Sequence, residues 1–303
     1  EIYTILFVGA SDVYKRQAGS SSGVSFGVDN MSLTVGGTAQ FNDADLTLNS
    51  ANLNFQNSPT LDNSSTLSVK NSSELILPSG GTFSDTSLNF TASTFKPSGT
   101  VSLTGSSDFT FDSGSSVMLG GDSTLSKSGS VTWPSLDLNG NTLTLASNIT
   151  DMSVDGAMSI GTGESLSSGS SILNLNDNLT IVSGGTLTSG SGKVQISEAL
   201  TLGGELVQGG GILNRIKGGT VGASGKLNRS GSELKLGSAL SIPGTLVVDN
   251  GTSWSGWQGT LDLSAGTLES SGGTLSLDQF TTSANTSFKL SGNTEITSSD
   301  NMT

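Results

Sequence analysis

Apolar residues recur at every second position in short segments along most of the chain. Pairs of the form apolar-x-apolar include Leu46/Leu48, Leu67/Val69, Leu143/Leu145 and Leu261/Leu263. Such alternation places both apolar side chains on one face of a strand and the polar residue between them on the other face. The i, i+3, i+4 spacing of an amphipathic helix is essentially absent. The pattern therefore predicts an all-β protein built from many short strands.

The strand pattern itself repeats, with a period of about 20–21 residues. A turn-like element, most often containing Gly, precedes each member of an evenly spaced series of leucines, namely Leu187, Leu206, Leu227, Leu246 and Leu268. The same phase extends to further apolar residues on both sides, namely Phe41, Leu61, Phe83, Val101, Leu125, Leu143, Leu166 and Phe288. We expect this series to face the core. Leu187 and Leu227 should then be buried, whereas Thr188 should face water.

About three short strands fit into each repeat, and Gly, Asn, Asp and Ser between them supply the turn conformations. This is the organisation of a β-solenoid, in which each coil is stable only when it packs against its neighbours. A β-sandwich would instead show hairpin signals such as Asn-Gly between longer strands. The coil lengths are too irregular for a strict left-handed hexapeptide repeat. We predict a right-handed parallel β-helix of about 12–13 coils, with three strands per coil.

The segment 1–17 differs from the rest of the chain. Ser11–Gln17 resembles the translation of a transposon end that is used in preparing sequencing libraries. An alternative is that Ile2–Ala10 is the apolar part of a signal peptide, although no basic region precedes it. We treat residues 1–17 as a sequence artefact or an unstructured leader. Residues 18–303 are expected to form a single β-solenoid domain that is a fragment of a longer protein, as metagenomic sequences often are.

Composition excludes most side-chain chemistry. The 303 residues contain no His and no Cys, and 25 acidic residues against 12 basic ones give a net charge of −13. Ser-His-Asp triads, thiolate nucleophiles, disulfides and metal sites with His or Cys ligands are therefore excluded. The negative charge argues against nucleic acid as a partner, and no apolar stretch is long enough for a transmembrane helix. We assign no catalytic, cofactor-binding or metal-binding residue and predict no enzymatic activity.

Clustered carboxylates would be the sign of a polysaccharide-cleaving β-helix enzyme. The closest acidic pairs are Asp43/Asp45, Asp108/Asp112 and Asp151/Asp155. Asp43 and Asp45 share a strand face by alternation, at a separation that glycoside hydrolysis uses. No third carboxylate accompanies any pair, so we interpret them as outward residues that keep a β-surface soluble. The segment 174–178 offers oxygen ligands for calcium, but it also fits a strand that runs into a turn.

Two sets of residues are candidates for contacts with glycans. Lys193, Arg215 and Lys235 are each separated by nearly one repeat length, so they can stack in one column and bind anionic glycans. The alternative is that they are solvated surface residues. Trp254 and Trp257 cannot both lie on one face of a regular strand, so one indole can be exposed at a turn and stack on a sugar. The alternative for this pair is core filling or capping of an edge.

Two Thr-x-Thr pairs, Thr142/Thr144 and Thr186/Thr188, raise a different hypothesis. A flat array of such pairs can order ice-like water. In the coil between them, Leu166 is flanked by two serines instead of two threonines. Ice binding is therefore a minor hypothesis.

A Gly-Thr-Leu motif recurs in the last third of the chain, in the segments 244–248, 259–263, 266–268 and 273–277. These segments resemble the repeats of autotransporter passenger and filamentous-haemagglutinin-like bacterial surface proteins. The resemblance is one of repeat texture, which covers most of residues 24–300. It implies a right-handed β-helix in a secreted or outer-surface protein that acts in adhesion or as a stalk. The chain departs from this group in having no recognisable membrane barrel or secretion domain.

These observations favour a non-enzymatic extracellular or cell-surface scaffold or adhesin segment with a polar, Ser/Thr/Asn-rich surface. Its expected partners are surface glycans or proteins of host or neighbouring cells, and no cofactor is expected. A carbohydrate-active β-helix enzyme, either a polysaccharide lyase or a glycoside hydrolase, is the alternative, and a phage or virion fibre segment is the third hypothesis. Three acidic residues that converge in one groove would favour the enzyme. End-to-end self-association is a further expectation, because terminal coils expose unpaired backbone groups.

Overall fold

The protein is an all-β solenoid. The structure is a computed structural model that describes residues 24–209, 213–216, 218–229, 234–236, 239–248, 253–254, 260–277 and 279–298. Parallel strands stack as a β-solenoid of about 11 turns, and the described residues contain no helix. The predicted all-β class and solenoid architecture are confirmed, although the structure has about 11 turns where the sequence predicted about 12–13 coils. The hand of the coil stays a prediction, as does the nature of residues 1–17, which lie outside the described residues. The chain divides into two compact units, of which unit 1 ends at Asn141 and unit 2 begins at Thr142.

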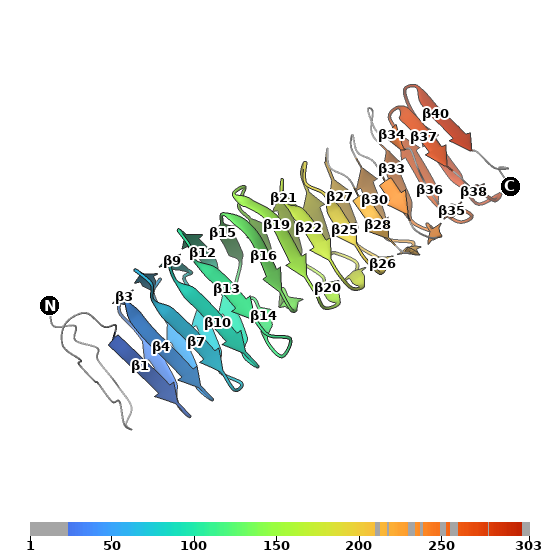
Figure 1. Ribbon diagram of the computed structural model, residues 1–303. Helices are drawn as coiled ribbons and strands as arrows, with labels where there is room; N and C mark the ends of the chain where they lie inside the picture. The colour runs from blue at the N-terminus through green and yellow to red at the C-terminus, as the bar shows by residue number, and fades with distance from the viewer. Residues whose placement is uncertain are drawn as a thin grey trace. The chain divides into compact units, whose positions relative to one another are not determined.

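In unit 1, successive strands of the chain enter three parallel sheets in turn (Figure 1). Sheet A contains β1 (Val24–Asp29), β4 (Ala44–Asn49), β7 (Thr66–Lys70), β10 (Ser87–Thr91) and β13 (Asp108–Phe111). Sheet B contains β2 (Ser32–Val35), β5 (Asn52–Phe55), β8 (Glu74–Leu77), β11 (Thr94–Pro97), β14 (Ser116–Met118) and β17 (Leu136–Asp137). Sheet C1 contains β3 (Gln40–Asn42), β6 (Thr60–Asp62), β9 (Gly81–Ser84), β12 (Gly99–Thr104) and β15 (Ser123–Lys127). The strand β16 (Gly129–Trp133) follows β15 and contacts β13.

Unit 2 follows the same three-strand cycle. Sheet C2 contains β18 (Thr142–Leu145), β21 (Ser165–Gly169), β24 (Thr186–Ser189), β27 (Glu205–Gln208), β30 (Lys226–Arg229), β33 (Thr245–Val248), β36 (Thr267–Ser270) and β39 (Ser287–Leu290). Sheet D contains β19 (Ile149–Val154), β22 (Ile172–Leu175), β25 (Val194–Ile196), β28 (Leu213–Ile216) and β31 (Leu234–Leu236). Sheet E contains β20 (Met158–Ile160), β23 (Leu179–Ile181), β26 (Ala199–Leu202), β29 (Gly218–Val221), β32 (Leu240–Ser241), β35 (Thr260–Asp262) and β38 (Gln279–Thr281). Sheet F contains β34 (Ser253–Trp254), β37 (Gly273–Leu277) and β40 (Thr294–Ser298).

The predicted leucine column is present in sheet C2. The parallel register joins each leucine to the next, in the order Leu187, Leu206, Leu227, Leu246 and Leu268. All five side chains are at most 1% exposed. Since neighbouring strands lie ~4.8 Å apart, each leucine packs directly on the one below it. The slightly uneven spacing of these leucines along the chain is therefore absorbed by the turns and leaves the column intact.

One position of the predicted column is displaced in unit 1. Phe83 pairs with Leu103, whereas Val101 pairs with Gly81 on one side and with Leu125 on the other. The column thus shifts by two positions at β12. The cause is the length of this strand, whose six residues carry two inward positions, so that both Val101 and Leu103 are 2% exposed.

Glycines form a second column at a corner of unit 2, directly before five successive strands of sheet C2. Gly185, Gly204, Gly225, Gly244 and Gly266 occupy this place, and a Cβ atom on any of them would lie 1.8–2.5 Å from a backbone carbonyl oxygen. Cβ atoms do not approach other atoms closer than 3.0 Å. The Gly of the Gly-Thr-Leu motif is therefore required by the close stacking of the coils.

Buried serines satisfy backbone amides at corners of unit 1. The Oγ atoms of Ser65, Ser73 and Ser107 accept hydrogen bonds from N–H groups of the preceding coil at 3.1, 3.0 and 2.9 Å. Each hydroxyl also donates to a backbone carbonyl, as Ser65 does to the Asp62 oxygen at 2.6 Å. These side chains are 0–6% exposed. Part of the large serine content is thus structural and does not contribute to the outer surface.

Candidate functional site

Hydroxyl side chains form columns on the outer face of sheet C1. Thr60, Thr82, Ser102 and Ser126 lie in register on β6, β9, β12 and β15. Their side chains point away from the core because they alternate with the buried residues of the same strands. This part of unit 1 therefore presents the same class of polar group in successive coils.

The outer face of sheet C2 begins with the two Thr-x-Thr pairs. Ser165 and Ser167 lie in register between these two pairs. Three adjacent coils therefore carry, in order, a threonine pair, a serine pair and a second threonine pair. The next coil replaces the pair by Glu205 and Val207. The hydroxyl pairs therefore extend over three coils. Sequence reasoning missed the serine pair as part of this series, although its spacing around Leu166 carried the signal.

Charged residues on the outer faces form ion pairs between adjacent coils. In sheet B, Lys96 Nζ lies 2.6 Å from Glu74 Oε1. In sheet C2, Lys226 Nζ lies 3.5 Å from Glu205 Oε1, and Lys289 Nζ lies 2.8 Å from Glu269 Oε1. The two pairs of sheet C2 join residues that are in register on neighbouring strands, whereas Lys96 lies two positions beyond Thr94, the residue that is in register with Glu74. Because these pairs are solvent-accessible, each contributes at most about 1 kcal/mol to stability.

The acidic pair Asp43/Asp45 does not have the geometry that the sequence predicted. Asp43 lies in the turn before β4 with a φ of 50°, whereas Asp45 lies within β4 on its outer side. Alternation therefore does not place the two carboxylates on one strand face, because Asp43 is not part of a strand. No group of three acidic side chains that could hold a metal ion occurs among the described residues.

Two other aspartates use their carboxylates inside turns. Asp85 Oδ1 accepts hydrogen bonds from the Ser106 backbone N–H at 2.9 Å and from its hydroxyl at 3.0 Å, which lowers the pKa of Asp85 below its ordinary value. The pKa of Asp112 is lowered mainly by the hydroxyl of Ser115, which donates at 2.6 Å, and by the Ala92 N–H. Both carboxylates therefore connect adjacent coils and stay ionised.

The oxygen-rich segment 174–178 forms the end of β22 and the turn that follows. Asn176 Nδ2 donates to Asp155 Oδ1 of the preceding coil at 2.8 Å. Asp177 Oδ1 accepts from the backbone N–H and the side-chain amide of Asn178 at 2.7 and 3.0 Å. The polar atoms are thus engaged in turn hydrogen bonds, as the strand-and-turn interpretation expects.

The three basic candidates lie on or directly beside successive strands of sheet D. The backbone register of sheet D joins Val194, Leu213 and Leu234 in one column. Lys193 lies directly before this column, Arg215 two positions after it and Lys235 directly after it. The register therefore does not join Lys193 to Arg215, whereas the irregularity in β28 leaves Arg215 within the stretch opposite Lys235, so stacking of all three residues stays a prediction. Lys193 is half-buried, and a glycan contact by any of the three stays a prediction.

The two tryptophan candidates are placed only in part. Trp254 lies in β34, where its backbone pairs with Leu275 of β37. Trp257 lies outside the described residues. Stacking of either indole on a sugar stays a prediction. The third tryptophan, Trp133, is 1% exposed and therefore belongs to the core.

Two cations occupy inward positions, which sequence reasoning missed. Lys127 lies in register with Leu103 at the end of β15 and is 9% exposed. Arg229 lies in register with Gln208 at the end of β30 and is fully buried. Burial lowers the pKa of Arg229 to about 9. The signal was available, because alternation from Leu125 and Leu227 places both residues on the inner face.

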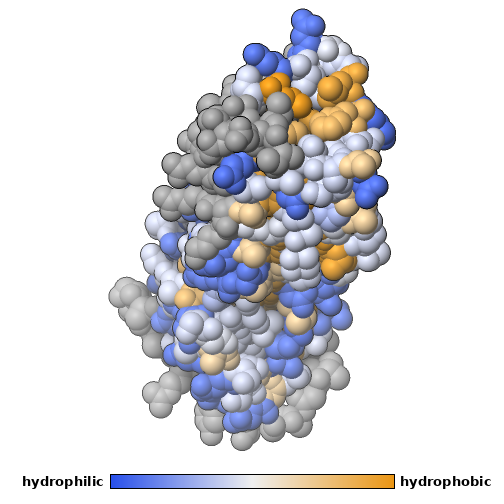
Figure 2. All heavy atoms as spheres, turned by 90° about the vertical axis from the view of Figure 1, so that its right-hand side faces the viewer, coloured by the Kyte–Doolittle hydropathy of each residue, from blue (hydrophilic) through white to orange (hydrophobic). Residues whose placement is uncertain are grey.

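Large apolar side chains are rarely exposed in the described part of the chain. Those that are exposed comprise Val182 at 37%, Phe288 at 45% and Leu290 at 50%. On the face drawn in Figure 2, hydrophilic and neutral residues predominate and hydrophobic residues gather in small patches. Phe288 and Leu290 lie on β39 and pair with Leu268 and Ser270. End-to-end self-association stays a prediction.

Comparisons with known proteins add no assignment. No family model matches the sequence, and no curated protein or solved structure is detectably similar to it. Among the described residues, no helix has the length and hydropathy needed to cross a membrane. Any functional proposal must therefore start from the geometry of the solenoid itself.

Proposed function

We propose that this chain is a non-enzymatic scaffold, a segment of an extracellular or cell-surface adhesin. Its task is to present a polar β-solenoid wall to glycans or proteins of other cells. The observation that carries the proposal is the in-register repetition of outward Ser and Thr across successive coils, from Thr60 to Ser126 and from Thr142 to Thr188. Each added coil extends the same surface by ~4.8 Å, which suits a repetitive binding surface or a spacer.

The way in which the carboxylates are used supports a scaffold over a polysaccharide-cleaving enzyme. A glycosidase needs two carboxyl groups about 5–10 Å apart and free to exchange protons with the substrate. Asp85 and Asp112 accept several hydrogen bonds within their turns. Their lowered pKa makes them poor general acids at neutral pH.

The Gly-Thr-Leu motif supports an origin among bacterial surface proteins. In the copies that begin at Gly244 and Gly266, the glycine lies at the crowded corner, the threonine begins a strand of sheet C2 on the outer face, and the leucine enters the core column. The motif thus encodes the transition from corner to strand. An outer-surface bacterial location follows from the resemblance to autotransporter and filamentous-haemagglutinin-like repeats and is part of the proposal.

The test measures binding and cleavage on the same panel of acidic and neutral polysaccharides. The purified chain should bind at least one polysaccharide reversibly and should release no new reducing ends and no unsaturated products. Lys193→Glu should weaken binding to an acidic polysaccharide, whereas Lys70→Glu, the same charge change at the exposed last residue of β7 in unit 1, should have a smaller effect. Product release in proportion to protein concentration would overturn the proposal in favour of the enzyme. Absence of binding to every polysaccharide and to intact cells would overturn the adhesive role.

Location is tested separately. Antibodies against the chain should label intact cells of the native host, and protease added to these cells should remove the signal. Labelling that requires permeabilised cells would overturn the proposed surface location.

A further inference from the structure

Sheet A of unit 1 ends at β13, although the chain continues into another strand beside it. β10 pairs with β13 along four residue pairs, from Ser87 with Asp108 to Phe90 with Phe111. β13 is the last strand in the order of sheet A. The strand that next contacts it, β16, is not hydrogen-bonded to it as a sheet neighbour within the described residues. We call this contact between β13 and β16 the seam.

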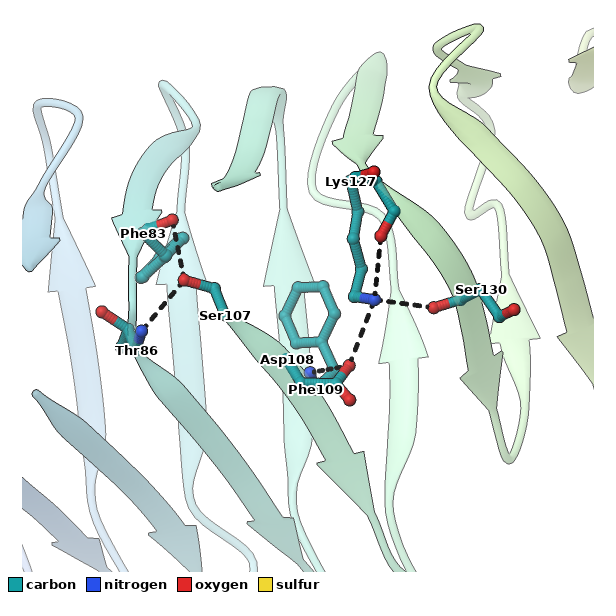
Figure 3. A network of polar contacts seen from close by, with 8 residues as sticks. Phe83, Thr86, Ser107, Asp108, Phe109, Lys127 and Ser130 are labelled. Carbon is teal, nitrogen blue, oxygen red and sulfur yellow. Dashed lines mark hydrogen bonds and ion pairs between the residues drawn. The ribbon is translucent and has the colours of Figure 1, made fainter. Parts of the chain in front are cut away.

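Lys127 bridges the two strands of the seam (Figure 3). Its Nζ donates to the backbone carbonyl of Ser130 on β16 at 2.9 Å, and it lies 3.6 Å from Oδ1 of Asp108 at the start of β13. A longer contact of 3.5 Å reaches the Ser128 carbonyl. The same carboxylate oxygen of Asp108 accepts from the Phe109 N–H at 2.8 Å, which fixes its direction. One ammonium group therefore contacts both strands where a row of backbone hydrogen bonds would otherwise join them.

The bond to the Ser130 carbonyl contributes more than the ion pair does. Asp108 has a side chain that is 67% exposed, so water screens its attraction to Lys127. The Lys127 side chain is only 11% exposed, so its hydrogen bond to a carbonyl is charge-assisted and partly shielded from water. In the core column Lys127 takes a place in register with Leu103. A leucine at this position would continue the column but would leave the Ser130 carbonyl without this donor.

We propose that Lys127 is a positioning residue that holds β16 against β13, and that the seam is the place where unit 1 opens first. Separating β16 from β13 requires the loss of the Lys127 contacts and of side-chain packing, but of no ladder of backbone hydrogen bonds between these two strands. Opening between any two other neighbours of sheet A requires the loss of a row of backbone hydrogen bonds as well. Trp133 at the end of β16 is 1% exposed and reports on the opening, because separation of β16 would expose its indole.

The test compares hydrogen exchange of the full chain in three forms: wild type, Lys127→Leu and Lys96→Leu. Lys96 is the matched control because it also forms an ion pair in unit 1, with Glu74, but lies on β11, which is paired on both sides. Once β16 no longer packs on β13, the ladder that joins β13 to β10 is free to fray at this end of sheet A. In Lys127→Leu, amides of β13 and β16 should therefore exchange at least about tenfold faster, since a charge-assisted hydrogen bond contributes ~1.5 kcal/mol or more and ~1.4 kcal/mol is a factor of ten. Amides of β7 and β10 should exchange at the wild-type rate. Acrylamide should quench tryptophan fluorescence more strongly in this variant.

Two results would overturn the proposal. The first is exchange of β13 and β16 in Lys127→Leu that is within twofold of the wild type, which would show that packing alone holds the seam. The second is faster exchange throughout unit 1, β7 and β10 included, which would show a general loss of stability and no local opening. Lys127→Arg, which keeps the charge and the donors, should restore most of the protection and separates the role of the hydrogen bond from that of side-chain volume.

Discussion

Gly244 offers a sharp test of how closely the coils of unit 2 stack. A Cβ atom at this position would lie 2.2 Å from the Gly222 carbonyl oxygen, 2.4 Å from the Gly225 carbonyl oxygen and 3.1 Å from a methyl carbon of Val221. No flexible side-chain end is involved in the two shortest contacts, so the alanine can be accommodated only if the backbone of one coil moves. The variant Gly244→Ala should therefore separate two coils at the corner.

The size of the effect follows from the contacts that must change. Overpacking of a rigid site costs ~1–3 kcal/mol. The displacement also disrupts the hydrogen bond from the Thr245 N–H to the Gly225 carbonyl, now 3.0 Å long, and leaves these buried groups unpaired at a cost of ~1–3 kcal/mol. We expect Gly244→Ala to lower the free energy of unfolding of unit 2 by about 4 kcal/mol, a large part of the ~5–15 kcal/mol typical of a domain.

Gly222→Ala provides the matched control, because it adds the same methyl group at the same corner. Its Cβ would meet the Leu202 carbonyl oxygen at 3.5 Å, an ordinary contact. Alanine at a compatible glycine position is neutral or stabilises by up to ~1 kcal/mol, since the unfolded chain loses freedom. Urea denaturation followed by circular dichroism measures both variants, and hydrogen exchange of β30 and β33 locates the effect. If Gly244→Ala and Gly222→Ala differ by less than about 0.5 kcal/mol, the steric explanation of the glycine column is wrong.

Three further predictions concern a corner serine, the core column and an aspartate in a turn. Ser65→Ala should lower the free energy of unfolding of unit 1 by ~1–3 kcal/mol in urea denaturation, because the buried Ala44 N–H loses its acceptor; an effect below about 0.5 kcal/mol would contradict this role. Leu187→Asp should lower the melting temperature strongly because it buries an unpaired charge, whereas Thr188→Asp on the outer face should change stability by less than ~0.5 kcal/mol. Equal losses of melting temperature in the two variants would contradict the assignment of Leu187 to the core and Thr188 to the outer face. Hydrogen bonds from Ser106 lower the pKa of Asp85 in the folded protein. The ionised carboxylate therefore stabilises the fold at pH values above its unfolded pKa of ~3.9, and this stabilisation is lost as pH falls through the lower pKa of the folded state. Asp85→Asn should therefore weaken the loss of stability below about pH 4, and an unchanged acid titration of stability would count against it.

The sequence shows how many hydroxyl and charged residues the chain has, but not which of them are neighbours on the outer faces. Alternation places Thr142 and Thr144 on an outer face, but which residues stand beside them depends on the register of the next coil. The structure supplies that register and brings Ser165 and Ser167 next to them. For Lys193 and Arg215 the register has the opposite effect, because Lys193 lies directly before Val194, whereas Arg215 lies two residues after Leu213, the residue that is in register with Val194. Spacing in the sequence is thus a poor guide to neighbours whenever turns vary in length.

By itself the sequence determined the fold class, the three-strand coil and most of the core. Period-two alternation is a local property of the backbone, so it assigns Leu187 to the core and Thr188 to the outer face without knowledge of any other coil. Contacts between coils were decided by tertiary structure alone, because they depend on which atoms stack at ~4.8 Å across a whole repeat. That is why the crowding at Gly244, the amide acceptor at Ser65 and the two-strand contact of Lys127 could not be read from the chain. Gly244 avoids and Ser65 satisfies a backbone group that belongs to another coil, and Lys127 reaches the Asp108 side chain nearly one repeat earlier in the chain.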